Sequence, residues 1–132
     1  MLRVAFSTTD GIHVDEHFGR CLRFDIYDVS VDGHRPVRTR VITTPDEPGD
    51  ETGRLDARID AVRDCAIVHL AAIGGGAAAR VTNARIHPVK VPETTEIASL
   101  LERLHSVLAG TPPPWLRRHL DTPTTSPAGS TR

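Results

Sequence analysis

The sequence has little of what nucleic-acid-binding proteins usually carry. Aromatic residues make up 4% of the 132 residues, and the formal net charge is −1 at pH 7. Few aromatic side chains leave little surface for base stacking, and a nearly neutral chain has no basic field that attracts phosphates. The composition therefore argues against a nucleic-acid partner. With 39% hydrophobic and 25% charged residues, it is typical of one globular domain.

Long apolar runs, a secretion signal and abundant cysteine are also lacking. No apolar run approaches the roughly 20 residues that a membrane-spanning helix needs, so no membrane partner is expected. The first residues, MLRVAFSTTDG, have neither a basic start nor a long apolar segment, so we expect a cytoplasmic protein. Cys21 and Cys65 are then expected to be reduced thiols rather than a disulfide.

Hydrophobic periodicity predicts an α/β domain over residues 1–120. Strands are expected over residues 2–8, 23–31, 35–44, 65–73 and 86–91. Helices are expected over residues 55–64, 77–85 and 94–110, with a loop over residues 45–54. Because apolar strands alternate with helices in the second half, we expect parallel crossovers and a two- or three-layer fold with a five-stranded mixed sheet. The tail, residues 121–132, is rich in Pro, Ser and Thr and is expected to be disordered.

Three consecutive glycines, Gly74, Gly75 and Gly76, stand between the apolar strand and the helix that follows it. Glycines let a ligand approach the backbone closely, and the amides at a helix N-terminus favour an anion. The same pattern suits a tight turn whose small residues allow close packing. A Walker A loop is excluded because its lysine and hydroxyl residue are missing. The sequence leaves both the anion site and the structural turn open.

The segment DGIHVDEHFGRC, residues 10–21, is dense in possible ligands. It follows the first strand as the glycines follow the central one, so both loops are expected to face one crevice beyond the carboxyl ends of the strands. His13, His17 and Cys21 are spaced four residues apart and would share one face of a helical turn. Imidazole and thiolate suit zinc, copper or iron–sulfur species. The alternative is a polar loop anchored by Phe18, with solvated histidines.

Other possible ligands in the chain have simpler interpretations. His69 lies in the central strand just before the glycines, where a histidine is usually a hydrogen-bonded core residue. Asp10, Asp15 and Glu16 have no spacing that sets a geometry for acid–base or two-metal chemistry, and acids at the start of a loop are more often caps. A GxSxG nucleophile motif is absent from the sequence.

Taken together, these motifs resemble the nitrogenase iron–molybdenum cofactor biosynthesis family. The similarity rests on VAFSTTDGIHVDEHFGRCLRFDIYDV, AIGGGAAARV, ARIHPVKV and GTPPPWLRRHL, and covers about residues 1–120. The family includes NifX, the core domain of NafY, VnfX and the C-terminal domain of many NifB proteins, and the chain looks most like the stand-alone NifX type. The resemblance implies a ribonuclease H-like fold with a five-stranded mixed sheet, about three helices and no nuclease chemistry.

For function, the resemblance implies a non-enzymatic carrier. Such proteins bind the iron–sulfur precursor that NifB makes, or later forms up to the mature cofactor, and pass it toward the NifEN scaffold. The HFG histidine of the family corresponds to His17, which is thus the strongest candidate ligand, accompanied by His13 and Cys21. In relatives, the strand before the glycines can carry a cysteine near the position of His69, which makes His69 a further candidate.

A carrier is expected to hold its cargo loosely. A permanent iron–sulfur site uses four cysteines, whereas one or two ligands would let the cluster leave. Because the cluster is anionic, we expect the amides of residues 74–76 and the side chains of Arg20, Arg23 or Arg80 to supply the remaining contacts. So few ligands allow either a monomer or a dimer that shares one cluster.

Two other functions are alternatives. The first is a small Mg²⁺-dependent, ribonuclease H-like hydrolase or nuclease, which would use Asp10 and further carboxylates. Residues 65–73 and 86–91 contain no carboxylate, which disfavours such an enzyme because its carboxylates lie at strand ends. The second is a family member repurposed to regulate other metal clusters.

Overall fold

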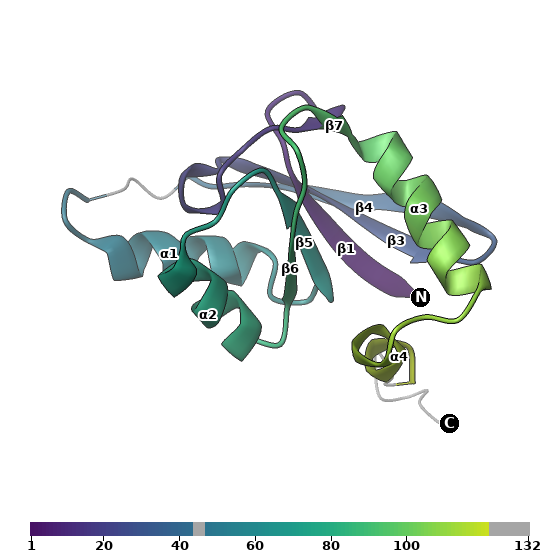
Figure 1. Cartoon of the computed structure of the whole chain (residues 1–132). Coiled ribbons are helices and arrows are strands. Elements are labelled where there is room, and N and C mark those ends of the chain that lie inside the picture. The colour runs from purple at the N-terminus through teal and green to yellow at the C-terminus, as the bar shows by residue number, and fades with distance from the viewer. Residues whose placement is uncertain (44–46, 122–132) are drawn as a thin grey trace.

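A five-stranded mixed sheet forms the centre of the computed structural model, which describes residues 1–43 and 47–121 (Figure 1). The strands are β1 (Leu2–Ser7), β3 (Arg23–Ser30), β4 (Gly33–Val41), β5 (Ile67–Leu70) and β6 (His87–Lys90). In the order β4-β3-β1-β5-β6, β3 is antiparallel to β1 and β4, whereas β5 is parallel to β1 and β6. The predicted mixed sheet is confirmed, while the ribonuclease H-like comparison stays a prediction.

Helices cover both faces of this sheet, so the fold has three layers. The helices are α1 (Glu51–Ala61), α2 (Gly75–Asn83), α3 (Ile97–Ala109) and α4 (Pro114–Asp121). Alternate residues of β1 point to opposite faces: Ala5 joins a buried cluster with α1 and α2, whereas Val4 and Phe6 join one with α3 and α4. Figure 1 shows α1 and α2 side by side on one face, and α3 across the other.

All three predicted helices have ends that differ from the sequence prediction, and a fourth helix was not predicted. Helix α1 begins at Glu51, four residues earlier than expected, because the Asp50 side chain accepts a hydrogen bond from the Gly53 amide and caps the helix. Helix α4 was not predicted; its first residue is Pro114, whose fixed φ suits that position, and its Leu116 is buried.

The segment after β1 is not a helical turn, which corrects the expected shared face of His13, His17 and Cys21. It forms β2 (His13–Val14), which pairs antiparallel with β7 (Thr95–Glu96), and then the short 3₁₀ helix η1 (Phe18–Arg20). His13 therefore lies in β2, whereas His17 and Cys21 flank the two ends of η1, so the three side chains do not share one face.

Within residues 1–43 and 47–121, no helix is long and apolar enough to cross a bilayer. Residue 121 ends α4, and the rest of the predicted tail lies outside the described residues.

Phe18 anchors the segment after β1 in the core. It is fully buried, and its ring centroid lies 5.8 Å from that of Phe24. Phe18→Ala removes this packing and leaves a cavity, so we expect the free energy of unfolding to fall by about 3–5 kcal/mol in urea denaturation. Leu22→Ala is the control: Leu22 is 57% exposed, and its loss is expected to stay within about 0.5 kcal/mol. Equal effects of the two variants would contradict the anchoring role of Phe18.

Candidate functional site

Backbone hydrogen bonds join the loops that follow β1 and β5. The Ala71 amide donates to the Glu16 carbonyl at 2.9 Å, and the Phe18 amide donates to the Ala72 carbonyl at 2.9 Å. Between them His17 forms a parallel bridge with Ala72. The two loops therefore meet beyond the carboxyl ends of neighbouring parallel strands, as the sequence indicates.

An open cavity of about 750 Å³ lies between these loops and helices α1 and α2. It brings together five residues that were predicted as site candidates: His17, Arg20, Gly74, Gly76 and Arg80. Helix α1 adds Glu51, Thr52, Arg54 and Leu55 to the lining. Because three arginines and one glutamate line the cavity, its charged side chains favour an anionic ligand.

His17 contributes the imidazole of this lining, a side chain of the kind that can ligate a transition metal. His17 is exposed and precedes η1 without making a capping hydrogen bond through its side chain. The neighbouring Phe18 is buried, so the backbone that carries His17 is anchored while its side chain stays accessible. A neutral imidazole in this position can give a nitrogen lone pair to a transition metal.

The N-terminus of α2 offers backbone amides to the same cavity. An α-helix leaves its first amides without partners inside the helix, and the Gly74 cap supplies no side chain to satisfy them. A Cβ atom at Gly74, Gly75 or Gly76 would meet no atom within 4 Å, so close packing does not require these glycines. This openness favours the anion site over the structural turn.

The cavity arginines differ in their surroundings. Arg80 of α2 forms an ion pair with Asp56 of α1 and donates to the Thr52 carbonyl at 3.4 Å. Arg54 lies 3.8 Å from the Glu51 carboxylate. Part of the positive charge of the site is therefore balanced by carboxylates of α1.

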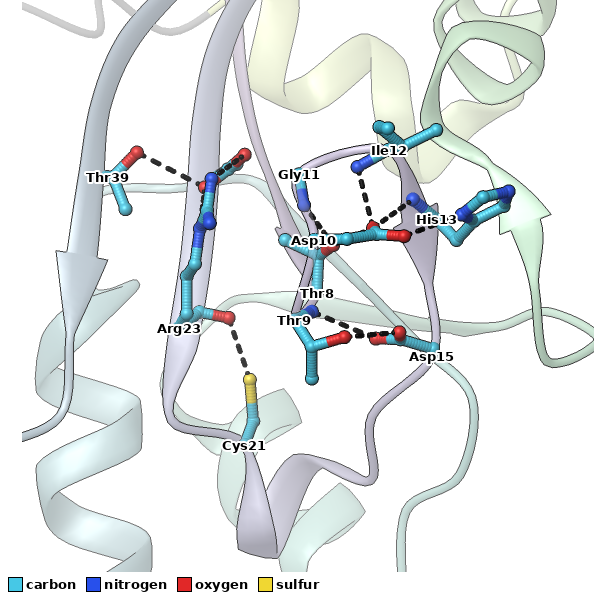
Figure 2. A network of polar contacts seen from close by, with 11 residues as sticks. Thr8, Thr9, Asp10, Gly11, Ile12, His13, Asp15, Cys21, Arg23 and Thr39 are labelled. Atoms are coloured by element: carbon cyan, nitrogen blue, oxygen red, sulfur yellow. Dashed lines mark hydrogen bonds and ion pairs between the residues drawn. The ribbon is translucent and has the colours of Figure 1, made fainter.

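His13 and Asp10 lie outside this lining and hold the loop before it (Figure 2). The Asp10 carboxylate is 2.8 Å from Nδ1 of His13 and accepts bonds of 2.8 Å from the amides of Ile12 and His13. The hydrogen bond between the side chains lowers the pKa of Asp10 and raises the pKa of His13. Asp10 is thus a loop cap, which is the role that the sequence indicates for it.

Cys21 and Arg23 also lie outside the cavity lining and make other polar contacts (Figure 2). The buried Cys21 thiol donates to the Arg23 carbonyl at 2.9 Å, and burial raises its pKa to about 12. Arg23 binds both carboxylate oxygens of Asp25, at 2.8 and 3.1 Å. Cys65 is also buried, and neither it nor Cys21 is joined in a disulfide in the described residues.

The three-ligand hypothesis is not realised in this conformation. His13, His17 and Cys21 point into different surroundings, and among the side chains described for residues 1–43 and 47–117 no three of His, Cys, Asp or Glu converge to hold a metal ion. Of these three candidate ligands, only His17 lines the cavity.

His69 is a core residue on the opposite face of the sheet. Its ring stacks on Phe6 at 4.5 Å, within the cluster that α3 covers, and Nδ1 lies 3.1 Å from the Ala5 carbonyl. Since a carbonyl only accepts, Nδ1 carries the proton. Burial lowers the pKa of His69 to about 4. The structure therefore corrects its assignment as a cargo contact.

The sequence did not lead us to expect that residues of α1 line the cavity. Residues 51–54 were placed in a loop, whereas they form the first turn of α1, and three of them line the cavity: Glu51, Thr52 and Arg54. The available signal was Asp50 followed by Glu51, since an aspartate cap and an acidic first turn mark a helix start.

Sequence and fold both have known relatives. A family model described as "Dinitrogenase iron-molybdenum cofactor" matches residues 1–107. The chain belongs to this family. Within it, NifX of Herbaspirillum seropedicae is 42% identical over 118 residues, which cover 89% of this chain and 80% of that protein. The resemblance to NifX-type members, drawn above from the motifs, is confirmed.

Two further relatives extend this comparison. The FeMo cofactor biosynthesis protein NifB of Bradyrhizobium diazoefficiens is 33% identical over 87 residues, which cover 65% of this chain and 17% of that protein. The crystal structure of PH0822 has a TM-score of 0.57 at 24% identity, covering 80% of this chain and 89% of that one, and thus shares the fold.

The buried state of His69 predicts a pH dependence of stability. Its pKa is about 4 in the folded chain and about 6.5 when unfolded, so below pH 6.5 the unfolded chain gains a proton that the folded chain lacks. Stability is thus lost as pH falls from about 6.5 to 4, by up to about 3 kcal/mol. His69→Gln keeps an amide donor but does not titrate. Urea denaturation at several pH values should show a flatter profile for His69→Gln, and identical slopes would contradict the assignment.

Glycines at the starts of α1 and α2 give a matched pair of substitutions. Gly76→Ala adds a Cβ in open space and improves helix propensity, so we expect a gain of up to about 1 kcal/mol in the free energy of unfolding. Gly53→Ala brings Cβ against the capping Asp50 carboxylate, which should offset that gain. Urea denaturation compares the two, and a clear loss of stability in Gly76→Ala would mean that packing requires the glycine.

Proposed function

We propose that this chain is a non-enzymatic carrier in the biosynthesis of the nitrogenase iron–molybdenum cofactor. It binds an iron–sulfur precursor of the cofactor as cargo in the cavity between the two loops and helices α1 and α2. The observation that carries the proposal is the placement of one accessible imidazole, that of His17, beside the open N-terminus of α2 and three arginines.

The chemistry of the lining suits loose retention of such a cargo. His17 gives one nitrogen ligand to iron, while the sulfides of the cluster accept hydrogen bonds from the α2 amides and from the arginines. The described lining contains no thiolate, and both cysteines are buried elsewhere. Most contacts are therefore electrostatic and can be exchanged one at a time when the cargo leaves.

Family membership supports the place of the chain in this biosynthesis. The family model carries the name of the cofactor, and a relative with a similar segment is the biosynthesis protein NifB. We propose that NifB supplies the cargo and that NifEN receives it. Later forms of the cluster, including the mature cofactor, would meet the same ligand chemistry, and a single imidazole suits a monomer or a dimer that shares one cluster.

Replacement of His17 tests this proposal. Anaerobic addition of the NifB product to the wild-type chain should leave near-stoichiometric cluster after desalting, measured as iron per chain with mass in solution. His17→Ala removes the proposed metal ligand, so we expect retention to fall by roughly tenfold or more.

The matched control is His13→Ala, which removes an imidazole that pairs with Asp10 outside the lining. This variant should retain cluster as the wild type does. Retention by His17→Ala equal to that of the wild type would reject the site, and failure of the wild type to retain cluster would reject the carrier function.

A further inference from the structure

The cavity arginine of α2 is already paired within the chain. The Arg80 guanidinium binds the Asp56 carboxylate and donates to the Thr52 carbonyl, so two contacts hold it against α1. Thr52 itself lines the cavity, and Asp56 lies four residues later on the same side of the helix. An anionic cargo that reaches Arg80 must therefore compete with a carboxylate that is already there.

The strength of this competition follows from the exposure of the pair. The side chains of Arg80 and Asp56 are 36% and 56% exposed. Exposed ion pairs of this kind change an equilibrium constant by only about fivefold or less, so a multiply charged ligand can displace the carboxylate. The Arg80–Asp56 pair is thus strong enough to weaken cargo binding but too weak to prevent it.

The other pair in the cavity is a poorer competitor. Glu51 and Arg54 are three residues apart on α1, separated by 3.8 Å, and the Glu51 side chain is 74% exposed. Arg80–Asp56 instead links two helices across the cavity wall. Among the side chains described for residues 1–43 and 47–117, no carboxylate lies within 4.0 Å of Arg20, so its charge is available to a ligand without exchange.

We infer that Asp56 is an intramolecular competitor of the cargo for Arg80 and sets how readily the cargo leaves. This inference rests on the proposed function, because it assigns a release device to the same site. In the empty cavity Arg80 pairs with Asp56. Bound cargo takes the guanidinium, and on release Asp56 takes it back, so Arg80 does not lose its partner when the cargo departs.

The test compares Asp56→Asn with Asp60→Asn. Both remove one negative charge from α1, but Asp60 pairs with Arg63, at 2.6 Å, and does not line the cavity. The probes are a synthetic anionic [4Fe–4S] cluster with thiolate ligands and, separately, inorganic phosphate, which needs charge but no metal ligand. We expect Asp56→Asn to bind each probe about two- to fivefold more tightly than the wild type and to lose the cluster to a chelator correspondingly more slowly. Asp60→Asn should remain close to the wild type.

A double-mutant cycle separates the pair from a general charge effect. In an Arg80→Gln background, Asp56→Asn should no longer change the affinity, because its competitor role needs the guanidinium. An unchanged or weaker affinity in Asp56→Asn, or a gain that persists without Arg80, would overturn the inference. If the wild type binds phosphate but retains no cluster, the carrier function fails while the phosphate affinities still decide the role of Asp56. Binding of neither probe by any variant rejects both.

Discussion

Two backbone hydrogen bonds fix the position of His17, the proposed ligand. They run between Ala71 and Glu16 and between Phe18 and Ala72, and they extend the parallel contact of β1 and β5 past the ends of both strands. In this register Phe18 enters the core and His17 faces the cavity. The buried Phe18 and the exposed His17 are adjacent in sequence, so this junction holds the imidazole at the cavity while its neighbour anchors the backbone.

The rest of the site follows from that junction. The residues after β5 that pair with the first loop lead directly into Gly74 and α2. The N-terminus of α2 and His17 therefore line the same cavity. Helix α1 then closes the cavity and brings carboxylates to arginines of α1 and α2. Under the proposed function, such a site would attract an anionic cluster through many weak contacts and would hold its iron through one nitrogen. That balance suits a protein that must release its cargo.

Much of the fold could be predicted from the sequence, because apolar periodicity reports directly on burial. The same reasoning predicted that the two loops meet, and His17 lies in the cavity lining at this junction. It failed for His69, since alternation within β5 decides which face a residue occupies, and the face that holds a ligand is a tertiary property. It failed for Cys21 because the spacing of His13, His17 and Cys21 implied a helical turn, whereas pairing of β2 with β7 imposes an extended backbone.

The account depends most on one imidazole meeting the cargo in the cavity between α1 and α2. An anaerobic crystal structure of the chain loaded with the NifB product, with anomalous scattering recorded at the iron edge, tests this directly. The account predicts iron within bonding distance of a His17 nitrogen, with the cluster facing the amides of residues 74–76 and the Arg20 side chain. Iron bound by Cys21, by His69, or on the face covered by α3 would contradict it.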